Sequence, residues 1–324
     1  MIQRRRLLQG AAAACAGFLG NARSQPGAGD KIIKWVLGFA AGGGTDSLAR
    51  AIAPKVSAHL GMPIVIENKP GANGNLAADL VARAAPDGLT FLYNTSSLVT
   101  SPALYAKPGF DPMKDFVPVA PISNVPLLLV ARPTLPPNSL AEFIAYAKAN
   151  PGKLTYASAG NGNSTHLANL LFQQALGISA AHVPYKGGGP ALNDVLGGHV
   201  DFYMDTANTA EAYAQKKLVK AYAVTGLKRL PMLPDVPTVA ESVAPGFEAG
   251  SWAGLVAPAK TSAEIVTRMN GAIRAVQQDP STAILFAQQM AEIRTGTPEQ
   301  YGEFLRSEME RWSGVIKGNH IQLD

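Results

Sequence analysis

The chain of 324 residues is long enough for two domains of ordinary size, and 47 % of its residues are apolar while 16 % are charged. This balance excludes a disordered chain and a bundle of membrane helices. The net charge of +5 falls to +2 once Arg4, Arg5 and Arg6 are set aside, and no other run of basic residues occurs. We therefore expect no nucleic-acid partner.

The first 22 residues are typical of an export signal. The basic start is followed by an apolar stretch, Leu7 to Gly20, which is too short to span a bilayer with ease. Residues 4–8, Arg-Arg-Arg-Leu-Leu, look like a twin-arginine signal. Cys15, the only cysteine, lies in the apolar stretch, and its lipidation is an open alternative. We expect a signal peptide over 1–22, cleavage near Ala22 and a soluble protein in the periplasm.

Short strand-like runs alternate with helical patterns along the remaining chain, which favours an α/β fold. The first part predicts strands at 32–39, 63–67 and 89–94, helices at about 45–60 and 77–84, and a proline-rich irregular stretch at 101–123. Pro54 is expected to kink or shorten the first of these helices.

The middle of the chain continues the alternation. A strand at 125–131 ends in residues 132–137, which contain three prolines and are interpreted as a crossing between lobes. Helices at 139–150, 165–176, 190–196 and 209–216 then alternate with strands at 154–158, 181–185, 200–204 and 219–225. A strand at 251–257 is interpreted as the return crossing.

Two helices are expected after the return strand. The first carries an apolar stripe from Ile265 to Val276, and the last opens at Thr297 with Pro298 behind it. The two crossings predict one lobe from 30–131 and 251–324 and a second lobe from 132–250. This layout is that of a hinged binding protein that closes over a cleft.

Two glycine-rich segments, Phe39 to Ala49 and Ser158 to Ala168, lie one in each expected lobe. Each follows a strand, runs through glycine to a hydroxyl residue, and enters a helix. The first turn of a helix has free N–H groups and partial positive charge, so such a corner can hold an anion without Lys or Arg. The alternative interpretation is a pair of ordinary tight turns with capping residues.

Other candidate residues stand at strand ends. Asn94 and Thr95 either offer neutral hydrogen-bonding groups to the cleft or form a polar turn. Asp205 either reaches the cleft or caps the next helix. The five histidines show no metal-ligand spacing and no carboxylate pair stands out, so we expect no enzyme, no metal and no cofactor. A hydrolase is kept as a further alternative.

The sequence resembles the Bug-type extracytoplasmic solute receptors, the substrate-binding proteins of tripartite tricarboxylate transporters. The matching stretches are Phe39 to Asp46, Val65 to Ala72, Ala85 to Gly88, Tyr156 to His166, His182 to Gly187, Leu233 to Val239 and Gly296 to Glu299. The resemblance implies an α/β two-lobe periplasmic-binding-protein (type II, Venus-flytrap) fold with two crossover strands. It also implies a carboxylate held by both glycine-rich loops, largely through backbone N–H groups and ordered water.

The expected ligand-binding residues follow from the loops, the strand ends and the resemblance together. They are Phe39, Gly43, Gly44, Thr45, Asn94, Thr95, Ser158, Asn161, Ser164, Thr165 and Asp205. The resemblance implies a monomer that binds a di- or tricarboxylate, an amino acid or an aromatic acid, with the permease subunits of a tripartite transporter as partners. A receptor that reports its ligand to a signalling partner is the alternative. The cleft positions vary within the family, so the ligand does not follow from the match.

Overall fold

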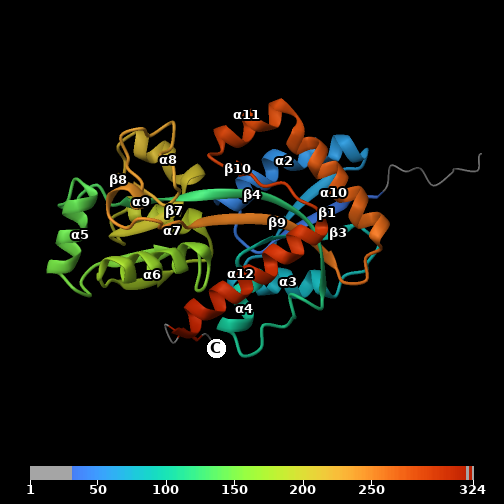
Figure 1. Ribbon diagram of the computed structural model, residues 1–324, viewed down its shortest axis with the longest axis horizontal. Coiled ribbons are helices and arrows are strands. Elements are labelled where there is room, and N and C mark those ends of the chain that lie inside the picture. The colour runs from blue at the N-terminus through green and yellow to red at the C-terminus, as the bar shows by residue number, and fades with distance from the viewer. Residues whose placement is uncertain (1–30, 319–320, 323–324) are drawn as a thin grey trace, which may run out of the picture. The chain divides into compact units, whose positions relative to one another are not determined.

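The structure is a computed structural model that describes residues 31–318 and 321–322 (Figure 1). The expected signal peptide, Cys15 and the cleavage site lie outside the described residues. The compact unit begins at Ile32 and is built from two β-sheets with helices on their faces. No helix among the described residues is both long and apolar enough to cross a membrane.

The first sheet has the strand order β2-β1-β3-β9-β4, with β10 paired to the outer edge of β4. The strands are β1 (Ile33–Leu37), β2 (Ile64–Asn68), β3 (Thr90–Thr95), β4 (Phe116–Ala131), β9 (Gly250–Pro258) and β10 (Glu292–Ile293). β1 runs parallel to β2 and β3, whereas β9 is antiparallel to β3 and β4. The carboxyl ends of β1 and β3 therefore open at one edge of this sheet.

The second sheet is built on the far end of β4. It contains β5 (Thr155–Ser158), β6 (Ala181–Pro184), β7 (Phe202–Thr206) and β8 (Lys220–Val224). β5 is parallel to β6 and β7, and the end of β4 lies antiparallel to β7 and β8. The sheets thus carry two lobes, and the sequence prediction of alternating strands and helices is confirmed.

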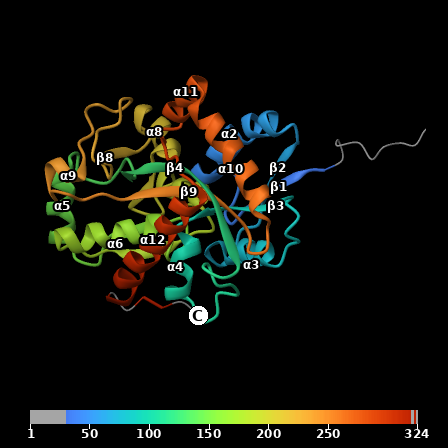
Figure 2. The same ribbon diagram turned by 45° about the vertical axis from the view of Figure 1, so that its right-hand side comes forward.

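Two adjacent strands connect the lobes (Figure 1, Figure 2). β4 pairs with β9 as far as Pro126, and from Leu127 onward it pairs with β7. At the start of β9, the Ala249 N–H donates to the Thr225 carbonyl of the second lobe. The change of sheet therefore occurs inside β4, a few residues ahead of the proline segment 132–137. The lobe boundaries at 131, 132, 250 and 251 stay a prediction.

The stretch 101–123, expected to be irregular, is irregular over 105–115 and regular at both ends. Its start is the last half of α4 (Ser97–Leu104), and its end is the first half of β4. The prolines misled the prediction, because β4 accommodates Pro118 and Pro121 beside shifts in its register with β9. Such irregularities are where a strand tolerates a residue without an N–H group.

Helices cover both faces of each sheet. Besides α4 they are α2 (Gly44–Leu60), a 3-10 turn (Ala72–Gly74), α3 (Asn75–Ala82), α5 (Leu140–Ala149), α6 (Ser164–Leu176), α7 (Gly188–Leu196), α8 (Ala207–Gln215), α9 (Val239–Ser242), α10 (Ala263–Gln278), α11 (Pro280–Gln288) and α12 (Pro298–Gly318). One core joins α2 and α10 with α7 and α8, a second lies under α5 and α6, and a third lies under α3, α4 and α12.

Three helices test the sequence interpretation. α2 runs unbroken through Pro54, so the expected shortening is wrong. α11 was not expected, although Asp279 caps it and Pro280 occupies its first position, a pattern typical of helix starts. In α10 the predicted stripe is confirmed, since Met269, Ile273 and Val276 are buried.

Candidate functional site

The glycine-rich loop of the first lobe leads from β1 into α2. Gly43 precedes the helix without any side-chain cap, so the first N–H groups of α2 have no capping side chain. The Asp46 carboxylate accepts from the Gly42 N–H at 3.0 Å and from Arg50 Nε at 2.9 Å. Burial raises the pKa of Asp46, but these bonds and one from Asn68 outweigh it and hold the pKa below its usual value. Asp46 thus holds the loop in shape.

The loop of the second lobe leads from β5 into α6 and is held by side chains. Asn163 Oδ1 accepts from the Thr165 N–H at 2.9 Å, and Thr165 Oγ1 accepts from the Ala159 N–H at 2.9 Å. The Gly162 N–H donates to His166 Nδ1 at 3.0 Å. Ser158 Oγ and His182 Nε2 share a hydrogen bond of 2.6 Å. This loop is therefore preformed by its own contacts.

A narrow inner cavity of about 30 Å³ lies between the two loops, with room for about two water molecules or a carboxylate group. Six of the expected residues line it: Phe39, Gly43, Gly44, Thr45, Thr165 and Asp205. The rest of the lining is Ala40, Asp46, Ala159, Asn163, Gly188, Tyr203, Thr206 and Ser251. Because Gly44, Gly188 and Thr206 stand at the starts of α2, α7 and α8, and Thr165 is in the first turn of α6, four helix N-termini meet here.

The electrostatics of the inner cavity are set by burial. No Lys or Arg is among the residues that line it. Burial raises the pKa of Asp205 to about 7, although hydrogen bonds from Thr209 Oγ1 at 2.5 Å and from the Thr206 N–H at 2.8 Å oppose the shift. The buried Tyr203 hydroxyl lies beside Asp205 and has no hydrogen bond of good geometry among the described residues. Asp205 can therefore carry a proton near neutral pH.

A wider outer cavity of about 250 Å³ shares Phe39 and Ala159 with the inner one. Asn161, an expected residue, lines it together with Asn73, Tyr105 and Lys186. Lys186 is the only charged side chain of this lining and forms no ion pair within the described residues. Both amide atoms of Asn73 are buried without a hydrogen-bond partner there. Unsatisfied buried amides are costly, so this group is prepared to bond to something in the cavity.

Four expected residues lie outside these two cavities. Asn94 and Thr95 border a separate crevice of about 10 Å³, where Asn94 exchanges hydrogen bonds with the Tyr301 hydroxyl at 2.9 and 3.1 Å. Ser158 is fully buried and bonded to His182, and Ser164 is buried at the start of α6. All four have structural contacts in this arrangement, and none of them faces the space between the loops.

The lobes touch directly around the cavities. Asn208 Nδ2 donates to the Gly44 carbonyl at 3.1 Å, and Thr100 Oγ1 donates to the Gly162 carbonyl at 3.0 Å. A β-carbon on Gly44 would lie 2.3 Å from Thr206 Oγ1 and 2.4 Å from Asn208 Oδ1. Glycine is required at this position because the opposite lobe approaches so closely. The structure is therefore a closed arrangement of the two lobes.

Sequence reasoning missed several residues of the site. Gly188 follows the loop after β6, which carries the same strand, glycine and helix pattern as the two chosen loops. Strand alternation places Tyr203 on the same face as Asp205, two positions away, although Tyr203 was not among the expected binding residues. Asn73 and Lys186 stand in two further glycine-rich loops, 69–75 and 185–189, which the sequence offers as candidates, the first also as a simple turn with a helix cap; only the closure of the lobes brings them to one cavity.

The described residues of the site form neither a metal centre nor a catalytic nucleophile that faces the cleft. Over residues 31–318 and 321–322, no group of three His, Cys, Asp or Glu side chains is placed to hold a metal ion. Ser158 and His182 do form a serine–histidine pair, but both cleft cavities are lined without them. The geometry is that of a binding site: two α/β lobes on two crossing strands, closed over a cleft, as in the two-lobe periplasmic binding proteins.

Comparison with known proteins identifies the family. Residues 48–321 match the family described as the Tripartite tricarboxylate transporter family receptor. A relative from Pseudomonas sp. strain P51, the UPF0065 protein in the tcbD-tcbE intergenic region, is 36 % identical over 97 % of this chain and 94 % of its own length. The chain belongs to this receptor family, whose relatives and structural neighbours are binding proteins and not enzymes.

Two solved structures are similar throughout. The periplasmic binding protein BugD is 37 % identical with a TM-score of 0.86, over 91 % of this chain and 99 % of its own. Rpa4515 from R. palustris, solved with adipate, is 36 % identical with a TM-score of 0.87, over 90 % and 98 %. The expected resemblance to Bug-type receptors and the two-lobe fold are confirmed.

Proposed function

We propose that this protein is an exported receptor that captures a small carboxylate between its lobes and delivers it to the permease subunits of a tripartite transporter. The observation that carries the proposal is the inner cavity, where four helix N-termini meet and no Lys or Arg is in the lining. Partial positive charge and free N–H groups bind a carboxylate at such a place. A relative solved with adipate supports this ligand class.

Asp205 can lie beside a carboxylate ligand when its own carboxyl group is protonated and therefore uncharged. A buried acid whose pKa is about 7 is largely protonated below neutral pH and can donate a hydrogen bond to a carboxylate oxygen. Tyr203 offers a second neutral donor from the same strand. The inner cavity then grips one carboxylate group with uncharged donors and helix ends.

The outer cavity can bind the end of the ligand that lies away from the inner cavity. Lys186 and the unpartnered amide of Asn73 are suited to a second polar or anionic group, one from each lobe. Phe39 and Ala159 line both cavities, so an apolar linker between the two ends would pass them. A di- or tricarboxylate matches this arrangement better than an acid with an apolar tail.

Thermal shift across di- and tricarboxylates, amino acids and aromatic acids, followed by calorimetry on the hits, tests the proposal. We expect one acid to bind and its methyl esters to bind much more weakly, because an ester lacks the charge that helix dipoles favour. Tight binding of a neutral or cationic solute in place of every acid would contradict the carboxylate assignment.

Export and delivery are tested separately. Amino-terminal sequencing of periplasmic protein should show cleavage near Ala22, and recovery of intact protein from the cytoplasm would contradict export. Deletion of the gene should abolish uptake of the bound acid. Uptake that persists while a transcriptional response is lost would favour the sensing receptor.

A further inference from the structure

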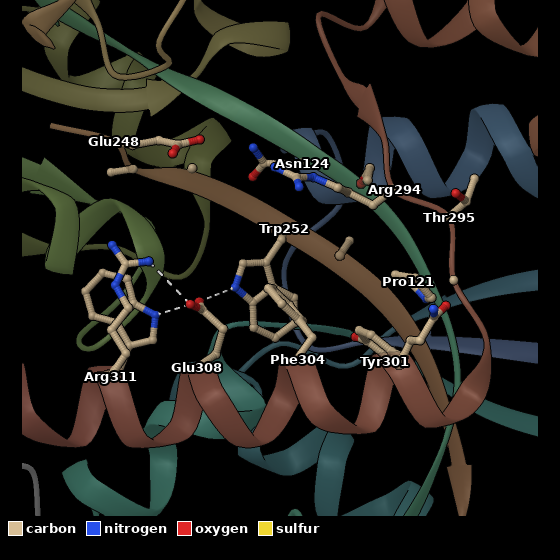
Figure 3. A pocket seen from close by; sticks show the side chains of 17 residues that line it. Pro121, Asn124, Glu248, Trp252, Arg294, Thr295, Tyr301, Phe304, Glu308 and Arg311 are labelled. Carbon is tan, nitrogen blue, oxygen red and sulfur yellow. Dashed lines mark hydrogen bonds and ion pairs between the residues drawn. The ribbon is translucent and has the colours of Figure 1, made fainter. Parts of the chain in front are cut away.

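A further cavity, of about 340 Å³, lies against the crossing strands outside the ligand cleft (Figure 3). Ser251 of β9 lines the inner cleft cavity, whereas its neighbours Gly250 and Trp252 line this further cavity. Successive residues of a strand point to opposite faces, so one layer of sheet separates the two spaces. We call the second space the hinge cavity, because β4 and β9 pass from lobe to lobe at its floor.

The hinge cavity has an aromatic wall that is held in place. Glu308 Oε2 accepts from Trp252 Nε1 at 2.8 Å and from Trp312 Nε1 at 2.9 Å. The buried carboxylate therefore holds both indole N–H groups, and Figure 3 shows its bond to Trp252 as a dashed line. A wall whose rings are locked by a buried charge is preorganised for a flat partner.

Phe304 extends this wall toward solvent. Its ring stands edge-on to Trp252, with centroids 5.1 Å apart, and 38 % of Phe304 is exposed. Pockets of 300–1,000 Å³ with aromatic walls and a few polar groups are the usual form of small-molecule sites. The hinge cavity falls in this range and has this composition.

One arginine of the cavity is available to an anion. Arg311 is occupied, since it bonds Glu308 at 3.3 Å and lies over the Trp312 ring at 4.8 Å. Arg294 has one long ion pair, with Glu292 at 3.6 Å, and its side chain is 55 % exposed. Glu248, the remaining acid of the lining, lies apart from Arg294 in Figure 3. A guanidinium recognises a carboxylate or sulfonate with two parallel hydrogen bonds.

We infer that the hinge cavity is a second binding site, separate from the cleft, for a small flat apolar molecule that carries one anionic group. The flat body lies on Phe304 and Trp252, and the anionic group meets Arg294. Because the floor consists of the crossing strands, the shape of the site depends on how the lobes are arranged.

Two fluorescent probes test this site on the full mature protein. The anionic probe is 8-anilinonaphthalene-1-sulfonate and its uncharged counterpart is N-phenyl-1-naphthylamine. We expect saturable binding of the sulfonate with energy transfer from the tryptophans, and binding of the uncharged probe about five-fold weaker or more. Phe304→Ala should weaken both probes, whereas Arg294→Gln should weaken the sulfonate alone.

Matched controls come from exposed positions outside the cavity. Ile284→Ala on α11 and Arg274→Gln on α10 should bind both probes as the unchanged protein does. Phe304 and Arg294 are exposed, and melting temperatures check that each variant is folded. Absence of saturable binding, or unchanged sulfonate affinity in either Phe304→Ala or Arg294→Gln, overturns the inference.

Discussion

The imidazole rings of His166 and His182 lie parallel, with centroids 3.9 Å apart and planes 5° apart. Burial lowers the pKa of His166 to about 3, with a further contribution from His182, and burial lowers the pKa of His182 to about 4. Both rings are therefore neutral in the folded protein near neutral pH. That state suits their contacts, since His166 Nδ1 accepts a hydrogen bond from Gly162.

The histidine pair predicts a loss of stability in acid. In the unfolded chain both rings titrate near 6.5, so between pH 6.5 and 4 the unfolded chain binds more protons and stability falls as the pH falls. In His166→Asn the amide oxygen replaces Nδ1 without titrating. We expect the loss of unfolding free energy from pH 7.5 to 4.5 to be smaller in this variant by about 2 kcal/mol.

Urea unfolding at both pH values measures this difference. His59 is exposed, and His59→Asn should keep the full pH dependence of the unchanged protein. An equal pH dependence in His166→Asn and the unchanged protein would show that the stacked rings do not govern acid stability.

Asp205 predicts the opposite pH dependence. Its pKa in the folded protein, about 7, is above the unfolded value of 3.8, so its stabilising contribution is present at low pH and is lost as the pH rises toward 7. The wild-type protein should lose on the order of 2 kcal/mol of unfolding free energy between pH 5 and pH 8 through this group, and Asp205→Asn should not show this loss. Asp235→Asn, at an exposed position, is the control and should keep the loss. The same pH dependence in both variants would refute the explanation.

Gly44 links closure of the lobes to ligand affinity. A β-carbon there would meet Thr206 and Asn208 of the opposite lobe, so Gly44→Ala should keep the lobes apart. We expect ligand affinity to fall about ten-fold or more, which corresponds to about 1.4 kcal/mol. Calorimetry measures the affinity and small-angle scattering the closure. Gly271→Ala, on α10 with open space around its β-carbon, should leave both unchanged. Full closure in Gly44→Ala would falsify this prediction.

The sequence predicted the loops that form the cleft better than it predicted the individual side chains that line it. The glycine loops were recognisable because a strand end, glycine and a helix start are consecutive in the chain, and six of the eleven expected residues line the inner cavity. Ser158 and Asn94 bond to His182 and Tyr301, and these contacts could not be predicted because the partners are distant in sequence. The loop that carries Asn73 is recognisable from its glycines, but lobe closure decides which of its side chains reaches the cavity.

The outer cavity predicts discrimination between a diacid and its half-ester. With a diacid that binds in the thermal-shift panel and its monomethyl ester as probes, Lys186→Gln should reduce the preference for the diacid by about five-fold or more, because the variant loses a charge-assisted bond. Asn73 has φ 54° and ψ 33°, which glycine adopts without strain, so Asn73→Gly removes its amide alone and should also weaken binding of the diacid.

Competition calorimetry measures both affinities in each variant. The control is Lys216→Gln, at an exposed position outside the cavities, which should keep the original preference. An unchanged ratio of diacid to half-ester in Lys186→Gln would remove Lys186 from ligand recognition while leaving the inner cavity as the carboxylate site.

The hydrogen bond from Asn208 to the Gly44 carbonyl also bears on the rate of ligand release. Contacts between the lobes that do not involve the ligand favour the closed state, so the ligand needs to supply less free energy to hold the lobes together. The same contacts must break before the ligand can leave, which lengthens its residence time. In the proposed delivery to a permease, the lobes have to separate at Asn208 and Thr100 before the ligand can pass, so the rate of that separation is an upper limit on the rate of delivery by one receptor.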